Sequence, residues 1–329
     1  MDKFRTEIIL GNYPIRISYG EISLFIGSCF TDHIGAKMEE AKFKIEINPF
    51  GVVYNPVSVK KSLELLIENR TFTGKDLHFS NERWFSFYHH SSFSDKDKNI
   101  CLSKINSRLS IASGFLRDAT ILFITFGTAR VYKFKETGEV VSNCHKLPAA
   151  TFSRELSCVD EIVKDYDELF IQLKEMNPKL QIVFTVSPVR HWKDGAAGNQ
   201  LSKSILLLAV HRLVEKYKHA FYFPSYEIMM DDLRDYRYYT EDMIHISQVA
   251  VNYIWDKFKS AFFDQKTLGI ILQFEKLKRA LNHRPFDGNS KAHQDFLKKI
   301  MQNIEMIEKQ FTFLDFENEK NIISKQLNL

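Results

Sequence analysis

The chain has 329 residues, of which 44% are hydrophobic and 26% are charged, a composition typical of a globular protein. This composition excludes a disordered chain, a collagen and a coiled-coil rod, and at roughly 150 residues per domain the length suits one large domain with an appendage, or two domains. The formal net charge of +4 is too weak to indicate a nucleic-acid-binding protein.

Five short runs rich in Ile, Val and Phe predict β-strands at residues 22–26, 43–47, 120–126, 181–186 and 220–223. Nearly continuous apolar runs of this length are typical of strands buried on both faces of a parallel sheet. Helical patterns lie between them, at residues 31–41, 56–68, 102–117, 159–176 and 201–218. Asn199 is the expected N-cap of the last helix. Strands that alternate with helices predict an α/β fold with a mainly parallel sheet.

Two insertions and a helical tail complete the pattern. Residues 81–94 form an aromatic and His-rich insertion, and residues 130–142 predict a β-hairpin that turns at Thr137-Gly138. The tail is rich in Lys, Gln and Glu at helical spacing. We therefore expect an α/β domain over residues 1–263 and a helical C-terminal appendage over residues 264–329.

No segment of the sequence indicates secretion, a membrane span or a metal site. The longest purely apolar stretch, residues 205–210, is far shorter than the roughly 18 residues of a transmembrane helix, and the N-terminal region lacks the apolar core of a signal peptide. The four cysteines share no CxxC spacing. We expect a cytoplasmic protein without metal or cofactor, which acts on a small-molecule substrate and has no nucleic-acid or membrane partner; the oligomeric state stays open.

Ligands of open α/β sheets bind outside the carboxyl ends of the strands, so the residues that follow each strand are the candidates for chemistry. These candidates are Gly27-Ser28-Cys29 after the first strand, Asn48, Gly51 and Asn55 after the second, Gly127 after the third, and Arg190-His191 after the fourth. Arg190 and His191 are candidates for binding a substrate carboxylate or phosphate.

The first of these segments predicts a nucleophile. Gly27 permits a sharp turn from strand to helix, and Ser28 and Cys29 then lie at the N-terminus of that helix. Free N–H groups at a helix start lower the pKa of a thiol and can stabilise an oxyanion.

A base for this nucleophile is available near residue 245. Asp242 and His245 are three residues apart, before an amphipathic helix. In this spacing the carboxylate can orient the imidazole, which can then take the proton of the nucleophile.

A nucleophile after the first strand and an Asp-x-x-His after the last is the chain order of the SGNH (GDSL-type) esterases. The string FIGSCFTD (residues 25–32) resembles the motif that names the GSCFA-domain proteins, which are similar to SGNH hydrolases. Five further segments resemble the same family: NPFGVVYNP (48–56), FGTARVY (126–132), NCHKLP (143–148), TVSPVRHWKDG (185–195) and EDMIH (241–245). The resemblance covers roughly residues 1–260 and leaves the tail outside.

The resemblance implies a three-layer α/β/α sandwich of about five strands, with Asp242 and His245 as the acid–base pair. It also implies that Gly51 and Gly127 donate N–H groups to the oxyanion. The chain departs from the SGNH pattern at Ala129, where that pattern has Asn, so a side-chain donor would come from Asn48, Asn55 or Asn143. A smaller departure is Ile246, where Pro is usual in the family.

The register of the motif leaves two nucleophiles open. In Gly-Asp-Ser the nucleophile stands two residues after the Gly, which favours Cys29, whereas the serine chemistry of the wider superfamily favours Ser28. Adjacent residues at a helix start point about 100° apart, so only one of them can face His245.

The function that follows is hydrolysis or transfer of an acyl ester, such as an acylated sugar or small metabolite, by Cys29 or Ser28 with the Asp242–His245 pair. Asn48, Asn55, Arg190 and His191 are the expected substrate contacts. The alternative is a degenerate SGNH-like module that binds a sugar, a nucleotide or an acyl carrier, and Ala129 is the residue that supports it.

Overall fold

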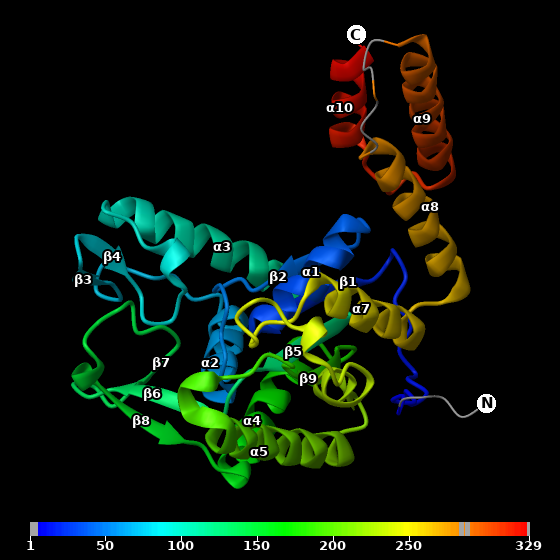
Figure 1. Ribbon diagram of the computed structural model, residues 1–329. Coiled ribbons are helices and arrows are strands. Elements are labelled where there is room, and N and C mark those ends of the chain that lie inside the picture. Colours follow the sequence, from blue (N-terminus) through cyan, green and yellow to red (C-terminus); the bar gives the residue numbers. More distant parts are fainter. Residues whose placement is uncertain (1–5, 283–285, 287–289, 328–329) are drawn as a thin grey trace.

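Five parallel strands form a single sheet at the centre of the protein (Figure 1). The computed structural model describes residues 6–282, 286 and 290–327. The strands of the sheet are β1 (Ile22–Gly27), β2 (Lys44–Ile47), β5 (Ile121–Phe126), β9 (Gln181–Val186) and β10 (Ala220–Tyr222). Each of them lies within one residue of a strand predicted from the sequence, so this part of the prediction is confirmed.

Helices cover both faces of the sheet, as in a three-layer α/β/α sandwich. The long helices of the body are α1 (Cys29–Glu40), α2 (Pro56–Ile67), α3 (Lys98–Asp118), α4 (Val159–Met176), α5 (Gly195–Lys216) and α7 (Gln248–Phe262). Short turns of helix are η1 (Ser91–Phe93), η2 (Ala149–Thr151), η3 (Trp192–Asp194), α6 (Ser225–Glu227), η4 (Ile228–Asp232) and η5 (Tyr236–Tyr238).

Alternate residues of each strand enter different cores, as strands buried on both faces must. Leu24 and Leu122 pack among the side chains of α2, α3, α4 and α5. Phe25 and Phe123 point to the other face, where their rings stack at 4.3 Å, and Phe123 meets Phe258 of α7 at 5.3 Å. The near-continuous apolar runs of the sequence therefore follow from burial on both sides.

Two small antiparallel sheets lie beside the body. One pairs β3 (His78–Ser80) with β4 (Arg83–Phe85), and the other has the order β7 (Val140–Val141), β6 (Arg130–Phe134), β8 (Phe152–Leu156). The β6–β7 pair confirms the hairpin predicted over residues 130–142.

The start of α5 differs from its prediction. The helix begins at Gly195 after the N-cap Asp194, six residues before the predicted start, so the prediction of Asn199 as the cap is wrong. Asn199 lies inside the helix, and its side-chain oxygen accepts the N–H of His191 at 2.9 Å. The amide therefore folds the segment after β9 back onto the helix.

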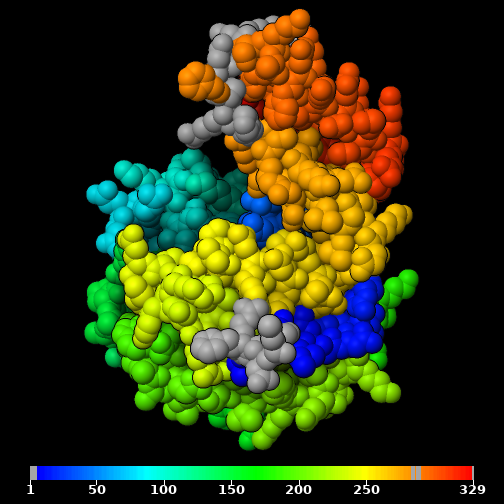
Figure 2. All heavy atoms as spheres, turned by 45° about the vertical axis from the view of Figure 1, so that its right-hand side comes forward, coloured from blue at the N-terminus to red at the C-terminus, as the bar shows by residue number. Residues whose placement is uncertain are grey.

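The tail is helical, as its sequence predicts, with α8 (Gln265–Leu281), α9 (Lys291–Gln310) and α10 (Glu317–Leu327). Figure 2 shows these helices, in orange and red, as a lobe that stands above the yellow segment containing α7. Phe274 of α8 connects the two parts, because its ring contacts Phe316 at 5.2 Å and Tyr19 at 6.1 Å. None of the helices in the described part of the chain has the length and apolar character that crossing a bilayer requires.

The order of the strands makes the ends of β1 and β5 the place where a ligand is expected. These two strands are neighbours, with β2 on one side and β9 and β10 on the other, so the winding of the chain reverses between them. This point of reversal is where open α/β sheets bind their ligands.

Gly27 ends β1 in a conformation that glycine alone adopts easily. Its φ is +143°, and a Cβ added there would lie 2.1 Å from the carbonyl oxygen of Thr125 in β5. The N–H of Gly27 donates to the side chain of Asn48 at 2.8 Å. The turn that leads into α1 therefore depends on the missing side chain.

We expect the substitution Gly27→Ala to lower the free energy of unfolding by more than about 2 kcal/mol, because it combines backbone strain with a collision against Thr125. Gly138→Ala is the matched control: its φ is also positive, at +74°, but nothing lies within 4 Å of an added Cβ. The control should cost only about 1 kcal/mol. Urea unfolding followed by circular dichroism checks both values, and equal losses would contradict the close approach.

Candidate active site

The turn after β1 brings two nucleophiles to the start of α1 in different surroundings. Ser28 is the N-cap residue and is 1% exposed, and its Oγ is buried without a hydrogen-bond partner. Cys29 is the first residue of the helix and is partly exposed. Of the two, only the Cys29 side chain is open to a substrate.

The pKa of the Cys29 thiol is raised rather than lowered. Burial is the largest cause, and the carboxylate of Asp32 raises the pKa further. Lys203 and the N–H groups of Cys29 and Phe30 act in the opposite direction and are outweighed. The prediction of a lowered thiol pKa is therefore wrong, because burial penalises the thiolate more than the helix start stabilises it.

Asp242 and His245 form the pair that their spacing predicts. The Oδ2 of Asp242 lies 2.6 Å from the Nδ1 of His245, and its Oδ1 accepts the N–H groups of Ile244 and His245, each at 2.9 Å. Thr240 donates its hydroxyl to the same oxygen at 2.7 Å. These donors, above all the His245 ring, hold the pKa of Asp242 well below its usual range. With Nδ1 directed at the carboxylate, Nε2 is the nitrogen suited to proton transfer.

The ends of three strands meet at Gly127, directly after β5. A Cβ added there would lie 3.1 Å from the Nε2 of His191 and 3.3 Å from both the Cβ of Ser28 and the ring of Tyr54. The rings of Tyr54 and His191 are perpendicular, 5.5 Å apart. The segments after β1, β5 and β9 and the segment before α2 therefore share one small space.

The pKa values of two imidazoles are lowered. Burial lowers the pKa of His191 to about 4, with contributions from Lys203 and from His245. Burial also lowers the pKa of His33 on α1, and His245 adds to that shift. A positive charge on His245 therefore opposes a positive charge on either ring.

The two glycines expected to stabilise an oxyanion use their N–H groups within the fold. The N–H of Gly51 donates to the carbonyl of Asn48, and that of Gly127 donates to the carbonyl of Tyr54, both at 2.7 Å. Both N–H groups are therefore already hydrogen-bonded within the backbone. In this arrangement neither glycine offers a free N–H to an oxyanion.

The two asparagines expected to contact substrate also serve the backbone. Asn48 accepts the N–H of Gly27 and donates to Asp32 at 2.5 Å. Asn55 is the N-cap of α2 and accepts the N–H of Ser58 at 2.8 Å. Both side chains therefore stabilise the local backbone.

The other two expected contacts follow β9. The guanidinium of Arg190 lies 4.6 Å from the centre of the exposed Trp192 ring. The ring of His191 approaches Gly127, with its Nε2 3.1 Å from a Cβ added there.

Lys203 is a site residue that the sequence analysis missed. It is fully buried on α5, and its Nζ donates to the carbonyls of Gly127 and Ser187, both at 2.7 Å. The signal was available, because Lys203 stands three residues before Leu206 on the buried face of its helix. A lysine at such a position is rarely buried without a reason.

The family models complete this description. A model described as the GSCFA family matches residues 23–258, which is most of the chain. The protein belongs to the GSCFA family. A second model, the C-terminal domain of GSCFA domain proteins, matches residues 274–329. The expectation that the tail lies outside the resemblance is therefore wrong.

Two further comparisons of this GSCFA protein add little. A search of curated protein sequences gives no match. Among solved structures, a family 3 carbohydrate esterase from Clostridium thermocellum aligns with a TM-score of 0.33 and 9% identity, over 77% of this chain and 98% of that chain. Among the described residues, no group of three or more His, Cys, Asp or Glu side chains could hold a metal ion.

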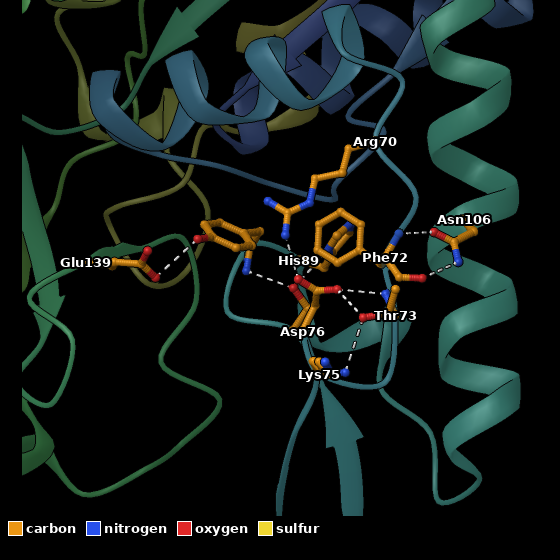
Figure 3. A network of polar contacts seen from close by, with 10 residues as sticks. Arg70, Phe72, Thr73, Lys75, Asp76, His89, Asn106 and Glu139 are labelled. Atoms are coloured by element: carbon orange, nitrogen blue, oxygen red, sulfur yellow. Dashed lines mark hydrogen bonds and ion pairs between the residues drawn. The ribbon is translucent and has the colours of Figure 1, made fainter.

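His89, in the aromatic insertion, belongs to the packing of the fold. Its ring lies 4.8 Å from Phe50 and 5.0 Å from Phe72, and its Nδ1 lies 3.1 Å from the Oγ of Ser86. Figure 3 shows it behind Phe72, beside the Arg70–Asp76 ion pair that holds the neighbouring loop. Burial lowers the pKa of His89 to about 3, so the ring is neutral at physiological pH.

We expect Asp32→Asn to speed the alkylation of Cys29 by iodoacetamide at pH 8 by roughly threefold to tenfold, since the thiolate is the reacting species and Asp32 opposes its formation. Peptide mass spectrometry gives the rate, with the exposed Cys158 as internal standard. Asp256→Asn, at an exposed carboxylate, should change nothing. A rate for Asp32→Asn equal to that of the wild type would contradict the coupling.

We expect His89→Leu to weaken the pH dependence of stability. Because the folded pKa of about 3 lies below the unfolded value of about 6.5, the unfolded chain binds the proton first as the pH falls, and stability is lost from about pH 6.5 downward. Between pH 7.5 and pH 5 this group should remove about 2 kcal/mol, and the variant should be spared that loss. Urea unfolding at both pH values measures it. Phe72→Leu, in the same cluster, should keep the full pH dependence of the wild type.

Proposed function

We propose that this GSCFA protein transfers the acyl group of an ester, with Cys29 as nucleophile, His245 as acid and base, and Asp242 as the group that orients His245. The observation that carries the proposal is the contrast between Ser28, whose hydroxyl is sealed, and Cys29, whose thiol is partly open at the start of α1. The register of the motif favours the same residue.

The reaction runs through a thioester. The Sγ of Cys29 attacks the ester carbonyl while its proton passes to the Nε2 of His245, and Asp242 stabilises the resulting imidazolium. The tetrahedral intermediate collapses as His245 returns the proton to the leaving alcohol. Water or a second hydroxyl then attacks the thioester, again with its proton taken by His245, which frees the Cys29 thiol.

The raised pKa of Cys29 explains why this chemistry needs a base. A thiol that is protonated at neutral pH is a weak nucleophile, so its proton has to leave during the attack. The Asp242–His245 pair is suited to that task, because the 2.6 Å contact fixes which nitrogen accepts the proton.

The start of α1 is the best candidate for an oxyanion site. The N–H groups of Cys29 and Phe30 both lower the pKa of the Cys29 thiol, so they favour negative charge at this place. A helix start also carries partial positive charge. In this proposal the N–H groups of Cys29 and Phe30, and not those of Gly51 and Gly127, stabilise the oxyanion.

The surroundings of Cys29 favour a neutral acyl group. The carboxylate of Asp32 would repel an anionic acyl chain, whereas it can accept hydrogen bonds from hydroxyl groups. The neutral ring of His191 is a second partner for a polar substrate, and Arg190 directly precedes it in the chain. An acylated sugar or a similar small hydroxylated metabolite fits this environment.

We expect turnover of p-nitrophenyl acetate, with the acetyl group trapped on Cys29 in intact-mass and peptide-mapping experiments. His245→Ala should lower the rate of acylation by roughly 100-fold or more, because general-base catalysis contributes about that much. Ser28→Ala is the matched control and should keep the acylation, since the Ser28 hydroxyl is sealed.

Acylation of Ser28, or labelling of Cys29 that ignores His245, would overturn the proposed mechanism. The absence of any acylation would favour the alternative of a binding module for a sugar, a nucleotide or an acyl carrier.

A further inference from the structure

Within the part of the chain that the structure describes, the buried ammonium of Lys203 has no carboxylate partner. Its hydrogen bonds go instead to the carbonyls of Gly127 and Ser187. These carbonyls belong to the first residues after β5 and β9. A buried cation without a counter-charge is costly, so a structure that keeps one has a use for it or for its neutral form.

Lys203 lies beneath the turn that carries the nucleophile. The carbonyl of Gly127 accepts its hydrogen bond, while the Cα of the same residue faces the Ser28 side chain, 3.3 Å from an added Cβ. A single residue therefore separates the ammonium from the Ser28-Cys29 turn. Burial lowers the pKa of Lys203 to about 7, and Cys29 opposes that shift. Lys203 in turn lowers the pKa of the Cys29 thiol.

Other titratable groups at this edge of the sheet also affect the charge of Cys29 and its neighbours. Asp32 raises the pKa of Cys29, and the rings of His33, His191 and Tyr54 complete the surroundings at the level of the turn. Tyr226, after β10, lies below, with its ring centre 5.8 Å from the Nζ of Lys203. His245, in the segment before α7, lowers the pKa of both His33 and His191. Lys203 is the one buried cation in this set of described residues.

We propose that Lys203 is a positioning residue for the nucleophile, whose ammonium stabilises the thiolate of Cys29 from the inner side of the site and offsets the carboxylate of Asp32. It acts through Cys29 and through the carbonyls of Gly127 and Ser187, without contact with the substrate. The inference rests on the proposed function for its value to catalysis, whereas the pairing of Lys203 with Cys29 is independent of any substrate.

The alkylation of Cys29 by iodoacetamide between pH 6 and pH 10 tests the pairing, because the rate follows the thiolate fraction. We expect Lys203→Met to lower the rate at pH 6.5, where Lys203 is mostly charged, by roughly tenfold, which corresponds to one unit in the pKa of Cys29. Lys216→Met is the matched control on the same helix, at an exposed lysine paired with Asp167, and should leave the rate at pH 6.5 unchanged. A purely structural Lys203 would leave this rate unchanged, and that result would overturn the inference.

A second pair of variants tests the same coupling with Lys203 in place. In Cys29→Ala the pKa of Lys203 in the folded protein stays far below the value of about 10.4 in the unfolded chain. Between about pH 7 and pH 10 the unfolded chain therefore binds more protons than the folded protein, and the free energy of unfolding rises with pH. In Cys29→Asp a permanent negative charge keeps the ammonium charged, so this rise should be smaller. Equal slopes for the two variants would overturn the inference, whether or not Lys203→Met folds.

The outcomes separate this inference from the proposed function. If the wild-type protein is never acylated by p-nitrophenyl acetate, but Lys203→Met slows the alkylation of Cys29 at pH 6.5, the pairing stands and the proposed activity falls. If Cys29 is acylated but Lys203→Met leaves its alkylation rate at pH 6.5 unchanged, the activity stands and the pairing falls.

Discussion

The site depends on the close approach of β1 and β5 at Gly27. The backbone of Thr125 occupies the space that a side chain at position 27 would need, so the chain can turn into α1 only with glycine there. That turn directs the start of α1, with its free N–H groups, to the point where the winding of the sheet reverses. The position of Cys29, the burial of Ser28 and the hydrogen bonds of Asn48 all follow from this contact.

Burial at this point has an electrostatic consequence. A thiol at an exposed helix start would have a lowered pKa, but here the same helix start is covered by neighbouring segments and by Asp32, so the pKa rises. Lys203 compensates in part from below, and its own pKa falls to about 7 because the carbonyl dipoles that hold it cannot replace water fully. The reactivity of Cys29 is thus the balance of one anion, one cation and a low-polarity environment.

The Asp242–His245 pair belongs to a different kind of environment. Both side chains are about half exposed, and their geometry is fixed by the backbone of the turn, where the carboxylate accepts two N–H groups as well as the ring. Such a pair holds its orientation without burial. In the proposed mechanism the base therefore has access to solvent for proton exchange, whereas the proposed nucleophile, Cys29, is only partly exposed.

The sequence by itself determined the five strands, the helices between them and the Asp242–His245 pair, because these depend on local apolar patterns and on a spacing of three residues. It also determined the family, through short motifs. The tertiary structure decided what depends on packing between distant segments: the burial of Ser28 against the partial exposure of Cys29, the use of the Gly51 and Gly127 N–H groups by neighbouring carbonyls, and the place of Lys203 beneath the turn. Hydrogen-bond partners and desolvation depend on neighbours that are distant along the chain, as Lys203 is from Cys29. For that reason the direction of the Cys29 pKa shift could not be predicted from the local sequence.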